Sequence, residues 1–136
     1  MQLSRILQVL LPALLLSCSS AEKAQSIMTG LAQAKYGSDV EYVSNESKSF
    51  VVCFNRPKVL PGHPLRPLRF LVFDMSNAEV VFEDSLESAD VYWVNDARLE
   101  VHFIPEVISE DEEANGYTYD VVTRTRSPYS RSGRRS

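Results

Sequence analysis

The spacing of apolar residues changes once along the chain, at Gly37. Between residues 21 and 36, apolar side chains recur every three or four positions, which predicts an amphipathic helix. Ser19 and Glu22 have the spacing of an N-terminal capping box, and Gly37 stands where a C-terminal cap belongs. The predicted apolar face of this helix consists of Ala24, Ile27, Met28, Leu31 and Ala34.

After the helix, apolar and polar residues alternate in short segments, which predicts antiparallel β-hairpins. Residues 40–44 and 48–55 are the first two expected strands, and the turn-forming residues 45–47 separate them. Residues 56–68 hold four prolines and one glycine, so we expect a surface loop there with no regular element. The last expected strand covers residues 116–123.

The segment 68–84 predicts a hairpin around a two-residue turn at residues 76–77. This pairing gives one face that is entirely apolar and a second face that mixes apolar and acidic residues. We expect the helix to cover the apolar face. That face would hold Leu71, Phe73, Met75, Ala78, Val80 and Phe82.

Residues 91–103 give the clearest hairpin, because Asn95 and Asp96 both tolerate the positive φ of a two-residue turn. A register that pairs Val94 with Ala97 gives one apolar face and one amphipathic face. Because tryptophan and arginine are favoured contact residues, we predict that the amphipathic face is a partner surface. It consists of Val91, Trp93, Arg98, Glu100 and His102.

These elements predict an α+β fold, in which one N-terminal amphipathic helix packs on one face of an antiparallel β-meander sheet. Residues 21–123 would form a single domain. The tail 124–136 is rich in serine and arginine and nearly free of apolar residues, so we expect it to be disordered. The hairpin sequences resemble single propeller-blade hairpins, although the chain is far too short for a closed propeller.

The first 17 residues have the composition of an export leader. Arg5 gives a short basic start, and the apolar run 6–16 would span about 16 Å as a helix, against about 30 Å for the core of a bilayer. A cleaved signal peptide, residues 1–17, therefore fits better than a transmembrane helix. The run ends in Leu15-Leu16-Ser17-Cys18, which resembles the lipobox of bacterial lipoproteins.

This resemblance implies that Cys18 becomes the lipidated N-terminus of the mature protein, with acyl chains such as palmitate. Residues 18–20 would form a short tether, and two or three acyl chains hold a protein at a bilayer almost irreversibly. Ser19 after the cysteine implies sorting to the outer membrane, on its periplasmic or its outer side. In the alternative, Ser19-Ser20-Ala21 directs cleavage after Ala21 and leaves a soluble exported domain.

Charge is strongly segregated, although the net charge is only −4. Residues 48–69 hold five basic residues and no acid, residues 70–120 hold fourteen acids with one arginine, and residues 121–136 hold five arginines and no acid. We expect the basic segments to contact anionic lipid or lipopolysaccharide rather than nucleic acid, and the alternative is that they fold back over the acidic region. The candidate membrane-contact residues are Arg56, Lys58, Arg66, Arg69, Arg124, Arg126, Arg131, Arg134 and Arg135.

Residues that carry catalysis are sparse. The chain has no GxSxG, HExxH, CxxC or phosphate-binding glycine loop, and His63 and His102 are its two histidines. Cys53 lies in an apolar strand, which indicates a buried structural thiol. The acidic run 110–113 lacks the ligand spacing of a calcium loop. We therefore expect no cofactor, no metal and no enzymatic activity.

The sequence thus predicts a non-enzymatic lipoprotein of the bacterial cell envelope that displays a small β-rich domain for binding or assembly with a protein partner. The layout of the whole chain resembles that of small envelope lipoproteins. A soluble exported binding or inhibitor domain is the first alternative, and a small enzyme or metal protein is the second.

Overall fold

The computed structural model describes residues 11–104 and 115–129, with side chains from residue 20 onward. Within these residues one long helix, α1 (Leu11–Tyr36), is followed by eight strands. The predicted α+β class with an N-terminal helix is confirmed. The strands are β1 (Glu41–Ser44), β2 (Phe50–Asn55), β3 (Leu68–Asp74), β4 (Glu79–Leu86), β5 (Ala89–Trp93), β6 (Arg98–Phe103), β7 (Gly116–Asp120) and β8 (Thr125–Tyr129).

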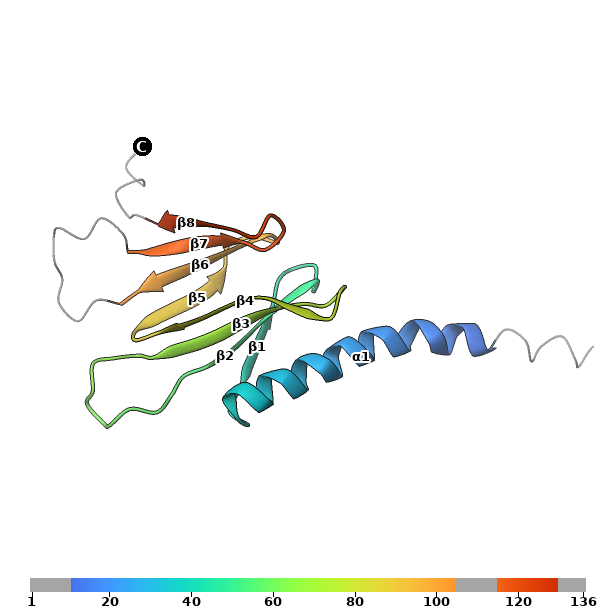
Figure 1. Cartoon of the computed structure of the whole chain (residues 1–136), viewed down its shortest axis with the longest axis horizontal. Coiled ribbons are helices and arrows are strands. Elements are labelled where there is room, and N and C mark those ends of the chain that lie inside the picture. Colours follow the sequence, from blue (N-terminus) through green and yellow to red (C-terminus); the bar gives the residue numbers. More distant parts are fainter. Residues whose placement is uncertain (1–10, 105–114, 130–136) are drawn as a thin grey trace, which may run out of the picture.

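The strands form two antiparallel sheets in place of the single meander expected from the sequence. Sheet A has the order β1-β2-β3-β4, and sheet B has the order β5-β6-β7-β8. Figure 1 shows three layers, with α1 on one side of sheet A and sheet B on the other. Alternation along a strand identifies its two faces but not the sheet that the next hairpin joins, so the split is not visible in the sequence.

The two sheets repeat one arrangement of strands and loops. Asp74 ends β3 and Asp120 ends β7, and each accepts a hydrogen bond at 2.9 Å from the backbone N–H two residues further on. The fourth residue of each loop, Ala78 or Arg124, has a positive φ of 51° or 57°. Each aspartate also pairs with the first residue of the preceding strand, β2 or β6. Both sheets therefore share one order of four antiparallel strands and a similar turn between the third and the fourth strand.

Two apolar cores hold the three layers together, and β3 contributes to both of them. Burial of one large apolar side chain contributes about 1.5–3 kcal/mol. The core between the sheets includes Val52, Leu68, Phe70, Val72, Leu99, Val101, Tyr117 and Tyr119. The core between sheet A and α1 consists of Met28, Ala32, Val51, Cys53, Leu71 and Phe73.

Cys53 is fully buried beneath α1, which confirms the prediction of a buried thiol. Burial raises the pKa of this thiol to about 12, so the group stays protonated at neutral pH. In the fold Cys53 therefore behaves as a small apolar core residue.

The buried stripe of α1 differs in part from the predicted one. Ala24, Met28 and Ala32 are buried, whereas Leu31 is 45% exposed and Ala34 is exposed. A flat sheet face touches a helix along a narrow line, which here follows every fourth residue. The helix also begins at Leu11, so the segment predicted to be a tether is helical in this chain. No helix in the described part of the chain has the length and hydropathy needed to cross a membrane.

The hairpin of β3 and β4 has a four-residue loop and a bulge in place of the predicted two-residue turn. Asp74 pairs with Glu79, and the register shifts between Val72 and Phe73, so that Phe82 pairs with Val72. A shift of one residue moves a side chain to the opposite face, because the side-chain period of a strand is two. Phe82 therefore packs in the core between the sheets and not against α1.

The predicted disorder of residues 124–136 is wrong for the first part of this segment, because β8 forms the edge of sheet B there. Arg126 lies over the ring of Tyr117, 3.8 Å from its centroid, and Arg124 pairs with a glutamate of β4 at 2.9 Å. Contacts of cationic side chains thus stabilise β8 and the turn before it, although this segment has few apolar residues. The remainder of the tail lies outside the described residues.

Polar contacts between hairpin loops fix the two sheets relative to each other. Asn45, which is 3% exposed, donates from Nδ2 to the backbone oxygen of Asp96 at 2.8 Å. Trp93 donates from Nε1 to the backbone oxygen of Val43 at 3.0 Å. The loop between β1 and β2 therefore packs against the hairpin of β5 and β6.

Gly116 opens β7 with a φ of +150°, and a Cβ atom at this position would lie 1.8 Å from the backbone oxygen of Val101. We expect Gly116→Ala to force β7 away from β6 and to lower the free energy of unfolding by about 3 kcal/mol or more. Gly30→Ala is the matched control, because a Cβ atom there would meet nothing within 4 Å. We expect this control to raise the free energy of unfolding by about 0.5–1 kcal/mol.

Urea unfolding of both variants, followed by circular dichroism, measures these changes. A Gly116→Ala variant as stable as the unmodified chain would contradict the register of β6 and β7.

Candidate functional site

The register of β5 and β6 divides the predicted partner surface between two faces. Trp93 pairs with Leu99, and Val94 donates to the backbone oxygen of Arg98, so the loop has three residues in place of two. Asn95 favours the longer loop, because its side-chain oxygen accepts hydrogen bonds from two backbone N–H groups, both at 2.9 Å. The one-residue shift exchanges the faces of one strand relative to the other.

Val91 and Trp93 consequently pack in the core between the sheets, which corrects their predicted place on the partner surface. The other three predicted residues lie on the opposite side of sheet B, where side chains of β5, β7 and β8 join them. We define the outer face of sheet B by Asp90, Tyr92, Arg98, Glu100, His102, Thr118 and Tyr129.

His102 is the centre of a polar and aromatic cluster on the outer face. Its Nε2 donates to the Glu100 carboxylate at 2.8 Å, and the Tyr92 hydroxyl contacts both ring nitrogens, with a distance of 2.7 Å to Nδ1. The ring meets Tyr92 edge-on, with centroids 4.7 Å apart, and stacks on Tyr129 with centroids 4.5 Å apart and 17° between the planes. Aromatic pairs of this kind contribute about 0.5–1.5 kcal/mol beyond their burial.

Gly116 makes the stack of His102 on Tyr129 possible. The two rings come from β6 and β8, and Gly116 of β7 lies between them in register. Strands two positions apart are separated by about 10 Å, so the rings can meet only by leaning over the strand between them. A side chain at position 116 would occupy the space between the two rings, whereas glycine leaves this space open.

The sequence pattern identifies two members of this cluster, Glu100 and His102, and misses the two tyrosines. Tyr92 is assigned to the wrong face by the one-residue error in register. Tyr129 falls in the segment predicted to be disordered. The available signal was the alternation of Thr123 and Thr125 with arginines, followed by Tyr129, since threonine and tyrosine favour strands.

The arrangement of the outer face favours binding. Rings that already pack against each other lose little rotamer freedom when a partner covers them. The carboxylates of Asp90 and Glu100 and the guanidinium of Arg98 place charges of both signs around the rings. No group of three or more His, Cys, Asp or Glu side chains within residues 20–104 and 115–129 could hold a metal ion.

The candidate membrane-contact residues are spread over several elements. Arg56 forms an ion pair with Asp90, and Arg66 lies 3.8 Å from the same carboxylate. Lys58 is exposed in the proline-rich loop, and Arg69 lines a cavity beside α1. Together with the ion pair between Arg124 and Glu79, these contacts agree with the alternative in which the basic segments fold back over the acidic region. Outside the described residues lie Arg131, Arg134 and Arg135.

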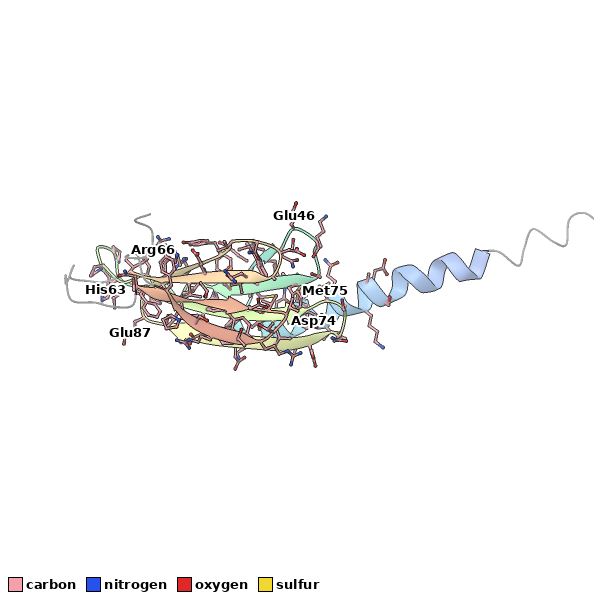
Figure 2. The ribbon with its side chains drawn as sticks, turned by 90° about the horizontal axis from the view of Figure 1, so that it is seen from above. Glu46, His63, Arg66, Asp74, Met75 and Glu87 are labelled. Carbon is pink, nitrogen blue, oxygen red and sulfur yellow. The ribbon has the colours of Figure 1, made fainter. Side chains whose placement is uncertain are left out.

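The two ends of the domain carry different segments. Figure 2 shows Glu46 and Met75 at the end from which α1 projects, and His63, Arg66 and Glu87 at the opposite end. We call these the proximal end and the distal end. Cys18, the predicted lipidation site, belongs to the N-terminal half of α1. This half of the helix projects from the domain (Figure 1). The proline-rich loop therefore lies at the end of the domain away from Cys18.

We expect the stacked pair to be energetically coupled. In a double-mutant cycle of His102→Ala and Tyr129→Ala, the coupling in the free energy of unfolding should be about 0.5–1.5 kcal/mol. A control cycle of His102→Ala and Tyr42→Ala should show no coupling, because Tyr42 lies on β1 of the other sheet. Urea unfolding of the single and double variants gives both values. Strict additivity for His102 and Tyr129 would argue against the stack.

Comparisons of the chain with protein-family models, with curated proteins and with solved structures find no match.

Proposed function

We propose that this chain is a non-enzymatic lipoprotein of the bacterial envelope, anchored through Cys18, whose two-sheet domain binds a protein partner. The observation that carries the proposal is the lipobox-like run Leu15-Leu16-Ser17-Cys18 at the end of an export leader. A thiol at this position is the acceptor of the diacylglycerol group in lipoproteins of this kind. Two or three acyl chains then anchor the protein stably.

The position of Cys18 along α1 supports this proposal. Ala24 is the first buried residue among the described side chains of the helix, six residues after Cys18. At 1.5 Å per residue, the intervening helix forms a stalk of about 9 Å. A lipid group on Cys18 would therefore leave in place the core contacts of α1 that the structure describes, from Ala24 onward. It would also turn the proximal end of the domain toward the bilayer and the distal end away from it.

This orientation changes the role proposed for the basic loop. Arg56 and Arg66 belong to the segment at the distal end, and both engage Asp90. Contact with the bilayer that holds Cys18 would require α1 to bend back, whereas the helix is continuous over the part that the mature chain would keep, from Cys18 to Tyr36. We therefore assign partner binding to the outer face of sheet B and not to the basic residues.

The outer face is suited to a protein partner by its residue types. Tyrosine and arginine are frequent anchors of protein interfaces, and Tyr92 is 41% exposed. Charged groups of both signs lie around the exposed ring, as in the polar rim of many protein interfaces. The alternative of a soluble exported binding domain, cleaved after Ala21, would use the same face, because it would also retain Ala24 and the rest of the core.

Substitution of the anchor residue should separate these alternatives. We expect Cys18→Ser to abolish acylation. The chain should then be found as the unprocessed precursor or in the soluble fraction, and no longer as an acylated protein of the membrane fraction. The control is Cys53→Ala, which removes the other cysteine and should leave acylation unchanged, because Cys53 is buried in the domain.

Intact mass spectrometry and fractionation of the envelope measure both effects. A wild-type mature chain that starts at an unmodified Glu22 would refute the anchor and support the soluble alternative.

Partner capture with the native lipidated protein tests the outer face. Tyr92→Ala and Tyr129→Ala should each weaken retention of a captured partner by about tenfold or more, because interface tyrosines are common hot spots. Tyr42→Ala is the matched control, since Tyr42 is exposed to a similar extent (39%) on the edge of sheet A. Equal retention by all three variants would place the binding surface elsewhere.

A further inference from the structure

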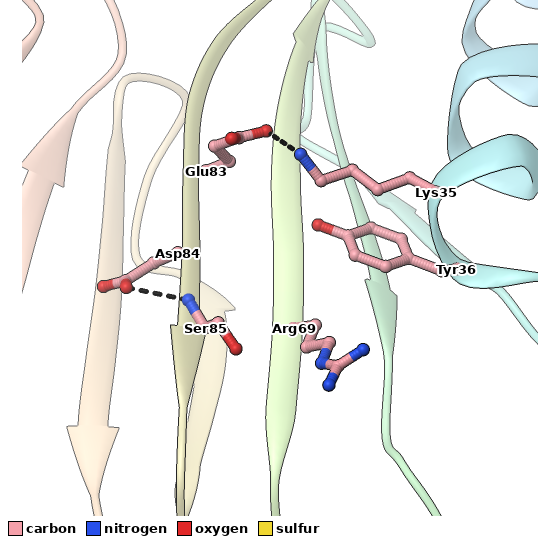
Figure 3. A pocket seen from close by; sticks show the side chains of 6 residues that line it. All are labelled: Lys35, Tyr36, Arg69, Glu83, Asp84 and Ser85. Atoms are coloured by element: carbon pink, nitrogen blue, oxygen red, sulfur yellow. Dashed lines mark hydrogen bonds and ion pairs between the residues drawn. The ribbon is translucent and has the colours of Figure 1, made fainter.

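The helix α1 covers only part of the face of sheet A on which it lies. Arg69 of β3 is on this face, in register with Asn55 of β2 and Ser85 of β4. In Figure 3 the side chains of Lys35 and Tyr36 extend from the end of α1 toward this part of the sheet. A single helix is about 10 Å wide, whereas four strands span about 15 Å or more, so a strip of sheet remains uncovered.

Two adjoining cavities occupy this strip, and Arg69 and Ser85 line both of them. The first has a volume of about 330 Å³, and the residues that line it are charged or polar types, among them Lys35, Tyr36 and Glu83. The second has a volume of about 400 Å³ and lies against the proline-rich loop. Pro57, Leu65 and Pro67 form its apolar wall, and Leu86 and Glu87 also line it. The strip is therefore a groove with a polar end and an apolar end.

The acidic groups at the polar end already have partners. Glu83 forms an ion pair with Lys35. Asp84 accepts hydrogen bonds from the Tyr117 hydroxyl at 2.6 Å and from the backbone N–H of Ser85 at 2.8 Å. In contrast, the guanidinium of Arg69 makes no hydrogen bond or ion pair with another described residue. Arg69 is thus the charge available to a ligand at the junction of the two cavities.

The surroundings of Arg69 favour one class of anion. Tyr36 offers a hydroxyl in the same cavity, and its pKa is raised to about 12, chiefly by burial, so it remains a neutral donor. Glu87 lines the second cavity and opposes additional negative charge there. A planar guanidinium matches a carboxylate with two parallel hydrogen bonds. The apolar walls match a hydrocarbon or aromatic body next to that carboxylate.

We propose that this groove is a binding site for a small monocarboxylic acid with an apolar body. Arg69 receives the carboxylate, and Leu65 with the neighbouring prolines receives the apolar part. The combined space is of the size that holds small ligands in other proteins. The site lies on the helix side of sheet A, away from the outer face of sheet B, so it does not depend on the proposed partner surface.

The test uses the full chain in lipid nanodiscs and three probes, namely 3-phenylpropionate, its neutral amide, and inorganic phosphate. Ligand-detected NMR titration measures the affinity of each probe. We expect saturable binding of the carboxylate. The affinity for the amide should be lower by a factor of about ten or more. We expect phosphate to bind no better than the amide, because it has no apolar part and carries more charge.

Variants assign the binding to the groove. Arg69→Gln should weaken binding of 3-phenylpropionate by about tenfold, whereas Lys23→Gln, which removes a positive charge from the exposed side of α1, should leave it unchanged. Leu65→Ser should weaken the carboxylate and the amide alike. Thermal unfolding of each variant, compared with the unmodified chain, verifies the fold.

The proposal is overturned if the carboxylate shows no saturable binding, if it binds equally to Arg69→Gln and the unmodified chain, or if phosphate competes with it on equal terms.

Discussion

The structure depends on the need of β3 to be covered on both faces. Leu68, Phe70 and Val72 face sheet B, while Leu71 and Phe73 face α1, and all five are almost inaccessible to solvent. Neither the helix nor the second sheet could cover both faces of β3 alone. Exposure of either apolar row to water would cost about 1.5–3 kcal/mol per side chain. The three-layer order follows from this constraint. The polar links between the hairpin loops then fix how the layers are aligned.

The residues at corresponding positions of the two sheets show why the second sheet ends the stack. By register, Phe50, Val52 and Phe54 of sheet A correspond to Arg98, Glu100 and His102 of sheet B. The first set packs against a neighbouring sheet, and the second set faces solvent. In repeat architectures a terminal unit with a polar outer face prevents further stacking. At the opposite end of the stack α1 takes the place of a neighbouring sheet, so both ends of the short array are closed.

This geometry separates three features that a lipid-anchored binding domain would require. Cys18, the proposed anchor residue, is on α1, the aromatic cluster is on the outer face of sheet B, and Arg69 lies beside α1 on sheet A. Each feature uses surface that the two cores leave free. The residues of the aromatic cluster can therefore be substituted without removal of a residue from either core.

The sequence alone determined the elements and several of their faces. The period of the apolar residues identified the helix, the hairpins and the burial of Cys53. The proline-rich loop was correctly placed between strands. These features depend on local backbone preferences and on side-chain alternation.

Only the tertiary structure decided the register of the strands and the elements that each strand packs against. A third loop residue, stabilised by Asn95, moved Trp93 into the core and Tyr92 to the surface. The edge strand β8 formed from a segment with almost no apolar residues, because the ring of Tyr117 and the carboxylate of Glu79 were available to Arg126 and Arg124. Such contacts join residues that are distant along the chain, and no local pattern encodes them.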